Sequence, residues 1–141
     1  MDIANQLRNF CEIHEIKQKD LATRLGISYK TVSGWINNHD TIPLKRLVDI
    51  SNIYKISIDN LLGISKINNY SFIALDKKII GYNLRKLRKQ NNMSIEQVSK
   101  KINISSGTYC DYENGKNLIK TVYLVNLLSI YEPFSIDNLF R

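Results

Sequence analysis

Apolar residues recur three and four positions apart in both halves of the chain, which is the spacing of one face of an α-helix. In the first half one such series runs from Ile3 to Cys11 and another from Leu44 to Ile50. The alternation of apolar and polar residues that is typical of strands is absent. The pattern therefore predicts an all-α chain, with helices in its first half near residues 3–14, 18–25, 29–37, 44–54 and 58–62.

Residues that favour helix N-termini stand where this pattern needs them. Pro43 suits the first turn of a helix, and Ser94 followed by Gln97 forms a capping box. Ser57 and Ser135 can each cap a short last helix that has an Asp in its first turn.

The sequence repeats itself after 77 residues, since residues 7–54 align without a gap with residues 84–131. Identical pairs include Leu7/Leu84, Arg8/Arg85, Ile27/Ile104, Thr31/Thr108, Asn37/Asn114 and Tyr54/Tyr131. After one inserted residue, Ser57–Leu61 recurs as Ser135–Leu139. A period of this length indicates a duplicated domain and not a solenoid repeat.

We therefore expect two tandem five-helix domains, at residues 1–64 and 79–141, joined by a linker at residues 65–78. The linker lacks Pro and contains several apolar residues, so we expect part of it to pack against a domain. Its apolar residues are Tyr70, Phe72, Ile73 and Leu75.

The second and third helices of each copy satisfy the steric requirements of a helix-turn-helix. The position nearest the crossing of the two helices is small, Ala22 or Ser99. The turn holds Gly26 or Asn103, residues that adopt positive φ readily. Residues suited to a left-handed C-cap follow the third helix. They are Asn37–Asn38 and Asn114–Gly115, and the expected core positions are Leu21, Leu25, Ile27, Val32 and Trp35, matched by Val98, Ile102, Ile104, Tyr109 and Tyr112.

Each copy resembles the lambda-repressor-like family, also called the xenobiotic-response-element type. The resemblance rests on Gln18–Ala22 with Leu25–Ser28 in the first copy, and on Ile104–Ser105 with Tyr112–Lys116 in the second. It implies a bacterial or phage transcription regulator whose third helix enters the major groove of double-stranded DNA, usually as a dimer.

In the first copy the family's base-reading positions fall on Tyr29, Lys30, Ser33 and Gly34, with Thr31 beside them. Lys30 can donate to guanine, and Tyr29 can pack on a thymine methyl group or bind a phosphate. The alternative is that both are only solvated surface residues. The resemblance also implies phosphate contacts. We expect these from Gln18, Ser28 and Asn37, and from Asn114 in the second copy.

The second copy is poorer in base-reading side chains. It has Gly107 where the first has Lys30, Asp111 where the first has Gly34, and Ile95 where the first has Gln18. Its first helix is nonetheless basic. We expect either a non-specific electrostatic contact with DNA or a protein-binding role, although the charges also fit a plain solvated face. The candidate DNA contacts are Arg85, Lys86, Lys89, Ser106 and Thr108.

Composition agrees with an anionic partner, because 20 Lys and Arg outweigh 13 Asp and Glu, for a net charge of +7. No run of 18 apolar residues and no signal peptide is present, so we expect a cytoplasmic protein that crosses no membrane. Two cysteines form neither a disulfide framework nor a zinc site. Cys110 is more simply a bystander thiol than a redox sensor.

Enzyme motifs are absent, so we expect no catalysis, metal or cofactor. His14-Glu15 begins like a zinc-protease motif, but Gln18 replaces the second ligand. We therefore expect a transcriptional repressor of phage, mobile-element or bacterial origin that acts as a homodimer. The alternative is a protein-interaction module, such as an antitoxin or adaptor. Because the two domains occupy nearly all of these residues, we expect no separate ligand-sensing module.

One ion pair is also predicted. The family pattern places Arg88 beside Glu113, and the first copy has the apolar residues Cys11 and Ile36 at the matching positions.

Overall fold

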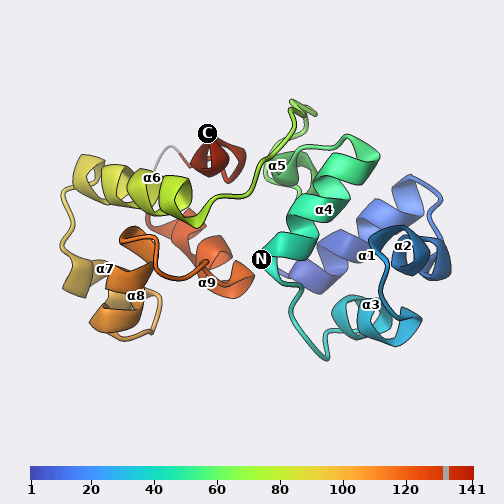
Figure 1. The fold of residues 1–141 in the computed structure, drawn as a ribbon, viewed down its shortest axis with the longest axis horizontal. Coiled ribbons are helices and arrows are strands. Elements are labelled where there is room, and N and C mark those ends of the chain that lie inside the picture. The colour runs from blue at the N-terminus through green and yellow to red at the C-terminus, as the bar shows by residue number, and fades with distance from the viewer. Residues whose placement is uncertain (132–133) are drawn as a thin grey trace. The chain divides into compact units, whose positions relative to one another are not determined.

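The first half of the chain folds into five helices (Figure 1). In the computed structural model, which describes residues 1–131 and 134–141, these are α1 (Ile3–Ile13), α2 (Gln18–Leu25), α3 (Tyr29–Ile36), α4 (Leu44–Tyr54) and α5 (Ile58–Leu61). The expected boundaries are reproduced to within one residue.

The second half repeats this order with a different ending. Its helices are α6 (Lys77–Gln90), α7 (Ile95–Lys101), α8 (Ser106–Glu113) and α9 (Thr121–Asn126), followed by the 3-10 helices η1 (Leu127–Ser129) and η2 (Asp137–Phe140). The fifth element of this half is therefore a 3-10 helix where α5 is an α-helix. Within the described residues no strand is present, and the predicted all-α fold with two tandem helix-turn-helix domains is confirmed.

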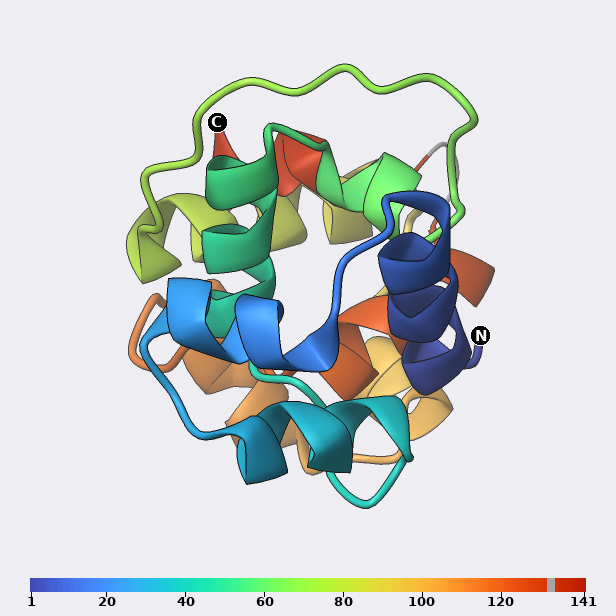
Figure 2. The same cartoon turned by 90° about the vertical axis from the view of Figure 1, so that its right-hand side faces the viewer.

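The chain divides into two compact units, Met1–Ile73 and Ala74–Arg141. Residues 65–73 are held to the first unit by side-chain amides. Asn52 donates to the backbone oxygen of Ile73 and accepts from its backbone N–H. Asn68 accepts from the N–H of Ser57 and donates to the oxygen of Lys55. This segment runs over the end of the first unit opposite α3 (Figure 2) and belongs to that unit, which ends at Ile73.

The helix-turn-helix of each unit is built as the sequence predicts. Gly26 has φ 69° and Asn103 has φ 60°, which turn the chain from the second helix into the third. Ala22 and Ser99 are buried at the helix crossings. The expected core positions are buried, except that Ile27 and Ile104 are half-buried because they lie in the turns. Asn38 and Gly115 have φ 60° and 70° after the third helices.

The predicted N-caps are also present. Ser94 and Gln97 form both hydrogen bonds of a capping box. Ser57 accepts from the N–H of Asn60, and Ser135 accepts from the N–H of Asn138.

Polar groups occupy the core of the second unit where the first is apolar. Glu113 is buried and pairs with Arg88, as the contrast with Cys11 and Ile36 predicted. Beside it the hydroxyls of Tyr109 and Tyr131 lie 2.9 Å apart.

Candidate nucleic-acid interface

Helix α3 has one buried and one exposed side. Ser28 caps its N-terminus by accepting from the N–H of Thr31, which starts the helix at Tyr29. Val32 and Trp35 then face the core. Tyr29, 52% exposed, and its exposed neighbours Lys30 and Thr31 are left on the outer side of the first turn. The structure therefore places these three expected base-reading residues together on one accessible surface.

Ser33 and Gly34 lie deeper than the other expected base-reading residues. Both are half-buried. The Ser33 hydroxyl accepts from the side-chain amide of Asn37. The oxygen of Gly34 accepts from the N–H groups of His39 and Asp40, and a Cβ at Gly34 would lie 3.2 Å from the Asp40 carboxylate. Gly34 thus accommodates the turn after α3.

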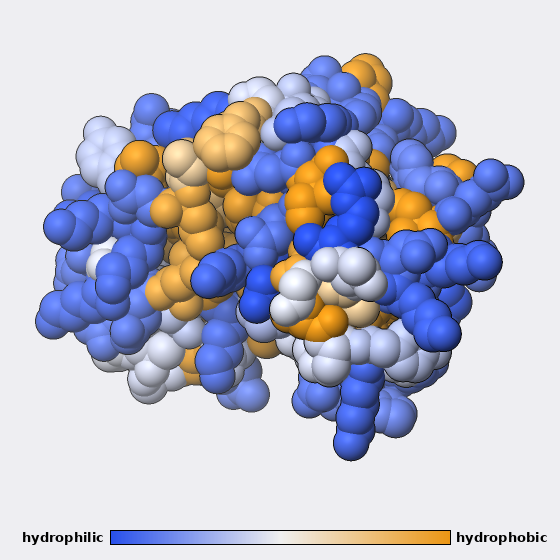
Figure 3. Space-filling model, turned by 45° about the vertical axis from the view of Figure 1, so that its right-hand side comes forward, coloured by the Kyte–Doolittle hydropathy of each residue, from blue (hydrophilic) through white to orange (hydrophobic). Residues whose placement is uncertain are grey.

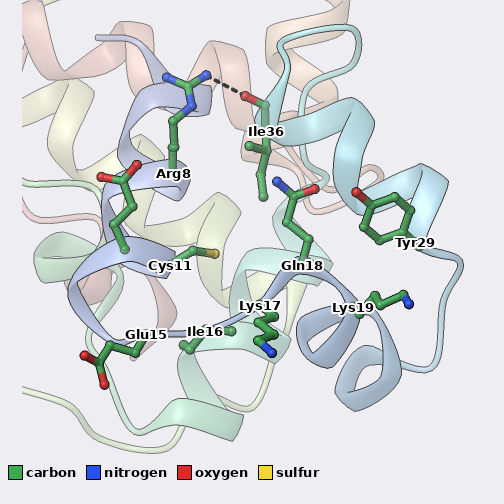
Figure 4. Close-up of a pocket in the computed structure, with 10 residues that line it drawn as sticks. Arg8, Cys11, Glu15, Ile16, Lys17, Gln18, Lys19, Tyr29 and Ile36 are labelled. Atoms are coloured by element: carbon green, nitrogen blue, oxygen red, sulfur yellow. Dashed lines mark hydrogen bonds between the residues drawn. The ribbon is translucent and has the colours of Figure 1, made fainter.

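The first residue of α2, Gln18, lies near the start of α3. Figure 4 shows its amide between Ile36 and Tyr29. The Oε1 atom of Gln18 is buried and has no hydrogen-bond partner among the described residues. Lys17 and Lys19 flank it and are exposed, which sequence reasoning did not single out. Their positions in the sequence on either side of Gln18, an expected phosphate contact, could have identified them as further DNA-binding candidates.

Two further expected phosphate contacts have intramolecular roles. Ser28 caps α3, and its hydroxyl also lies 2.9 Å from that of Thr31. Asn37 is exposed at the end of α3 and retains its side-chain oxygen for another partner, since only its N–H₂ group bonds to Ser33.

The corresponding surface of the second unit is weaker in hydrogen-bond donors. Ser106, Gly107 and Thr108 are exposed on the first turn of α8. The Ser106 hydroxyl lies 3.3 Å from that of Ser99, and Thr108 approaches the capping Ser105. No cationic side chain stands on this turn.

The expected DNA contacts on α6 fall into two groups. Arg85 donates to Asn114 at 2.7 Å and lies 3.5 Å from the carboxylate of Glu113, so both Arg85 and Asn114 have partners within the unit. Lys86 and Lys89 are exposed and form no ion pair with any described residue. Lys86 and Lys89 are therefore more available to bind DNA phosphates than Arg85.

The described residues were also compared with the requirements of metal sites and of membrane spans. No group of three or more His, Cys, Asp or Glu is placed to hold a metal ion. None of the described helices has the length and apolar character needed to cross a bilayer.

Comparison with known protein families identifies both halves. Residues 7–61 match a family model described as helix-turn-helix, and residues 81–138 match one described as helix-turn-helix domain. No curated protein and no solved structure matches the chain.

Proposed function

Because this chain belongs to the helix-turn-helix family, with one lambda-repressor-like domain in each half, we propose that it is a sequence-specific repressor of transcription. The observation that carries the proposal is the outer surface of α3, where Tyr29, Lys30 and Thr31 are exposed together. A helix of this kind enters the major groove and presents its first turn to base edges. We place the protein in the cytoplasm of a bacterium, or on a phage or mobile element.

In this proposal Lys30 and Tyr29 read bases, with Thr31 beside them. Gln18 and Asn37 bind phosphate from either side of the reading surface, and Ser28 does so at the N-terminus of α3. Lys17 and Lys19 add positive charge next to Gln18. Such charges strengthen binding to any sequence and make it salt-dependent. Ser33 and Gly34 support the helix and its following turn.

We assign the second unit a supporting role. Lys86 and Lys89 are exposed cations suited to flanking phosphates, whereas α8 has no cation on its first turn. Two chains then place their first units on the half-sites of one palindrome, as is usual for this fold. Sedimentation of the free and DNA-bound protein tests this arrangement. A complex of one chain that protects two unlike half-sites would contradict it.

A second candidate function is a protein-interaction module, and one observation favours it. Apolar side chains reach the surface of the protein in patches (Figure 3). The large apolar side chains that are exposed in the second unit include Ile79, Tyr82 and Val122, of which Tyr82 is 68% exposed. The same 77-residue shift places Asp2, Asn5 and Lys45 at the matching positions of the first unit. Apolar residues at positions that are polar in the duplicate suit a protein partner.

A gel shift with random double-stranded DNA, followed by enrichment and sequencing, separates the two functions. The proposed repressor selects one motif. Binding that salt abolishes and that selects no motif, or no binding at all, would instead favour the interaction module.

A further inference from the structure

One side of α6 is exposed over most of the length of the helix and combines cationic with apolar residues. Residues three, four and seven positions apart lie on the same side of a helix. This spacing joins the exposed residues Lys78, Ile79, Tyr82, Arg85, Lys86 and Lys89, which we call the outer face of α6. Four of the six are cationic and none is acidic. Tyr82, which is 68% exposed, lies at the centre of the face.

The other side of α6 is packed into the second unit. Ile80 and Leu84 are buried in its core. A Cβ at Gly81 would lie 2.5 Å from the backbone oxygen of Tyr112, so the backbone of α6 lies directly against the end of α8. The second unit therefore completes its own core without the outer face, which is left free to contact a partner.

The duplicated domain shows that the fold does not require this combination of residues. The 77-residue shift matches the outer face with Met1, Asp2, Asn5, Arg8, Asn9 and Glu12 of the first unit. These residues include one cation and two acids, and polar residues stand where the second unit has Ile79 and Tyr82. Exposed positions that are polar in one copy, and both apolar and cationic in the other, suit a binding surface.

The charge and the apolar residues of the outer face together determine the chemistry of its partner. The cations favour a partner that carries carboxylates or phosphates. Lys86 and Lys89 are the most available of them, because Arg85 already bonds to Asn114. The outer face of a second copy would bring like charges together, which is unfavourable.

The two apolar residues favour a protein over DNA. Tyr82 and Ile79 gain from leaving water only when they contact another apolar group. A row of DNA phosphates provides negative charge but no such group. An acidic protein segment that carries a large apolar side chain provides both.

We propose that the outer face of α6 docks an acidic segment of another protein. Carboxylates of this segment bind Lys86 and Lys89, and one leucine or aromatic side chain packs on Tyr82 and Ile79. This interaction goes beyond the proposed repressor function and does not require the first unit to read DNA. DNA phosphates are the competing occupant, because the proposed function also assigns Lys86 and Lys89 to flanking phosphates.

Titration of the isotope-labelled full chain with synthetic peptides, followed by amide NMR, tests the docking. The first peptide is an acidic amphipathic helix of glutamate and leucine, about 15 residues long so that it can form a helix. The second peptide has serine in place of each leucine, and the third has lysine in place of each glutamate. The first should give saturable shifts at residues 78–90 and none at the matching residues 1–13. The second should bind at least fivefold more weakly, and the third should not bind.

Two of the possible results would overturn the proposal. If the first peptide gives no saturable shift at residues 78–90, the outer face does not bind an acidic segment. If the first two peptides bind equally well, the apolar residues of the face contribute nothing and the attraction is only electrostatic.

Substitutions at exposed positions connect the binding to the outer face. Tyr82→Asn introduces the residue type of Asn5 without a change in charge, and it should weaken binding of the leucine peptide at least fivefold. Lys86→Ala with Lys89→Ala should weaken it at least tenfold. Lys100→Ala with Lys101→Ala removes the same charge from exposed positions of α7 and should change the affinity less than twofold. Equal losses in the two double variants would show that net charge, and not the outer face, binds the peptide.

Binding of random double-stranded DNA distinguishes the competing occupant. We expect Tyr82→Asn to leave the affinity for DNA unchanged, because the ring packs on the protein partner and not on phosphate. If Tyr82→Asn weakens DNA binding but not peptide binding, the outer face is a DNA surface and the proposal is wrong. Failure of the chain to select a DNA motif would contradict the repressor function alone, since the peptide titration does not depend on it.

Discussion

Arg88 and Glu113 form a two-point ion pair in the second unit, with Nε 2.8 Å from Oε2 and Nη2 3.1 Å from Oε1. The Glu113 side chain is fully buried and that of Arg88 is 12% exposed. The Glu113 hydrogen bond raises the pKa of Arg88 further above its usual range, so the guanidinium stays charged at ordinary pH. This pair connects α6 with the end of α8 and so fixes the helix-turn-helix against the first helix of the unit.

Glu113→Ile should destabilise the second unit, because it leaves Arg88 with little solvent and no carboxylate. The expected loss in the free energy of unfolding is about 3–5 kcal/mol, the usual cost of removing one partner of a buried pair. Adding Arg88→Cys reproduces Cys11 and Ile36 of the first unit and should recover part of the loss. Urea unfolding followed by NMR of second-unit residues measures both. Strictly additive effects would show that the two residues are not coupled.

Gly81→Ala and Gly107→Ala should change stability in opposite directions. A Cβ at Gly81 would lie 2.5 Å from the backbone oxygen of Tyr112, whereas one at Gly107 meets nothing within 4 Å. We expect a loss of about 1–3 kcal/mol for Gly81→Ala from overpacking. For Gly107→Ala we expect a gain of up to about 1 kcal/mol, since Ala favours helix. Thermal unfolding compares them directly, and a stable Gly81→Ala protein would mean that α6 and α8 are less closely packed.

Alkaline pH should unfold the second unit through Tyr109 and Tyr131. Burial raises the pKa of Tyr131 to about 12, and burial with the mutual hydrogen bond also raises that of Tyr109. Unfolded tyrosine has a pKa of about 10. The folded state therefore holds these protons more tightly, so the stabilisation is complete below about pH 10 and is lost as the pH rises towards 12. Each group contributes up to about 1.4 kcal/mol per pH unit in this range.

Urea unfolding between pH 9 and 11 provides the measurement, with Tyr109→Phe plus Tyr131→Phe as the comparison. The double variant should show a smaller alkaline loss in the second unit. The first unit has Val32 and Tyr54 at the matching positions and so lacks the tyrosine pair. It serves as an internal control, reported by the fluorescence of Trp35, the one tryptophan of the chain. Equal pH slopes in the parent and the double variant would exclude these tyrosines as the cause.

Lys30→Ala should weaken binding to the selected DNA motif by about 1–3 kcal/mol and relax the preference at one base pair, as expected for loss of a direct base contact. Lys66→Ala removes the same charge from the exposed segment at the opposite end of the unit, and it should leave the motif unchanged. Quantitative binding to single-base variants of the motif distinguishes them. If both substitutions weaken all sequences equally, Lys30 contacts phosphate and does not read a base.

The helices and turns could be predicted from the sequence because the two copies show the same pattern at matching positions. Gly26 and Asn103 have positive φ in the corresponding turns of the two units. The contact between Arg88 and Glu113 could be predicted because both residues are replaced by apolar ones, Cys11 and Ile36, in the first copy. The intramolecular partners of the candidate DNA-binding residues could not be predicted from the sequence. The bond from Arg85 to Asn114 joins residues far apart in sequence, and a Cβ at Gly34 would lie only 3.2 Å from the Asp40 carboxylate. Neither relation produces a periodic signal.

In the proposed function the first unit reads the DNA sequence and the second does not. This assignment is tested most directly by enriching random double-stranded DNA with the parent chain and two variants. Tyr29→Ser with Lys30→Gly gives the first unit the matching residues of the second, and Ser106→Ala with Thr108→Ala truncates the exposed hydroxyls of α8. We expect the first variant to lose the parent motif and the second to retain it. A motif that persists in the first variant and disappears in the second would contradict this assignment.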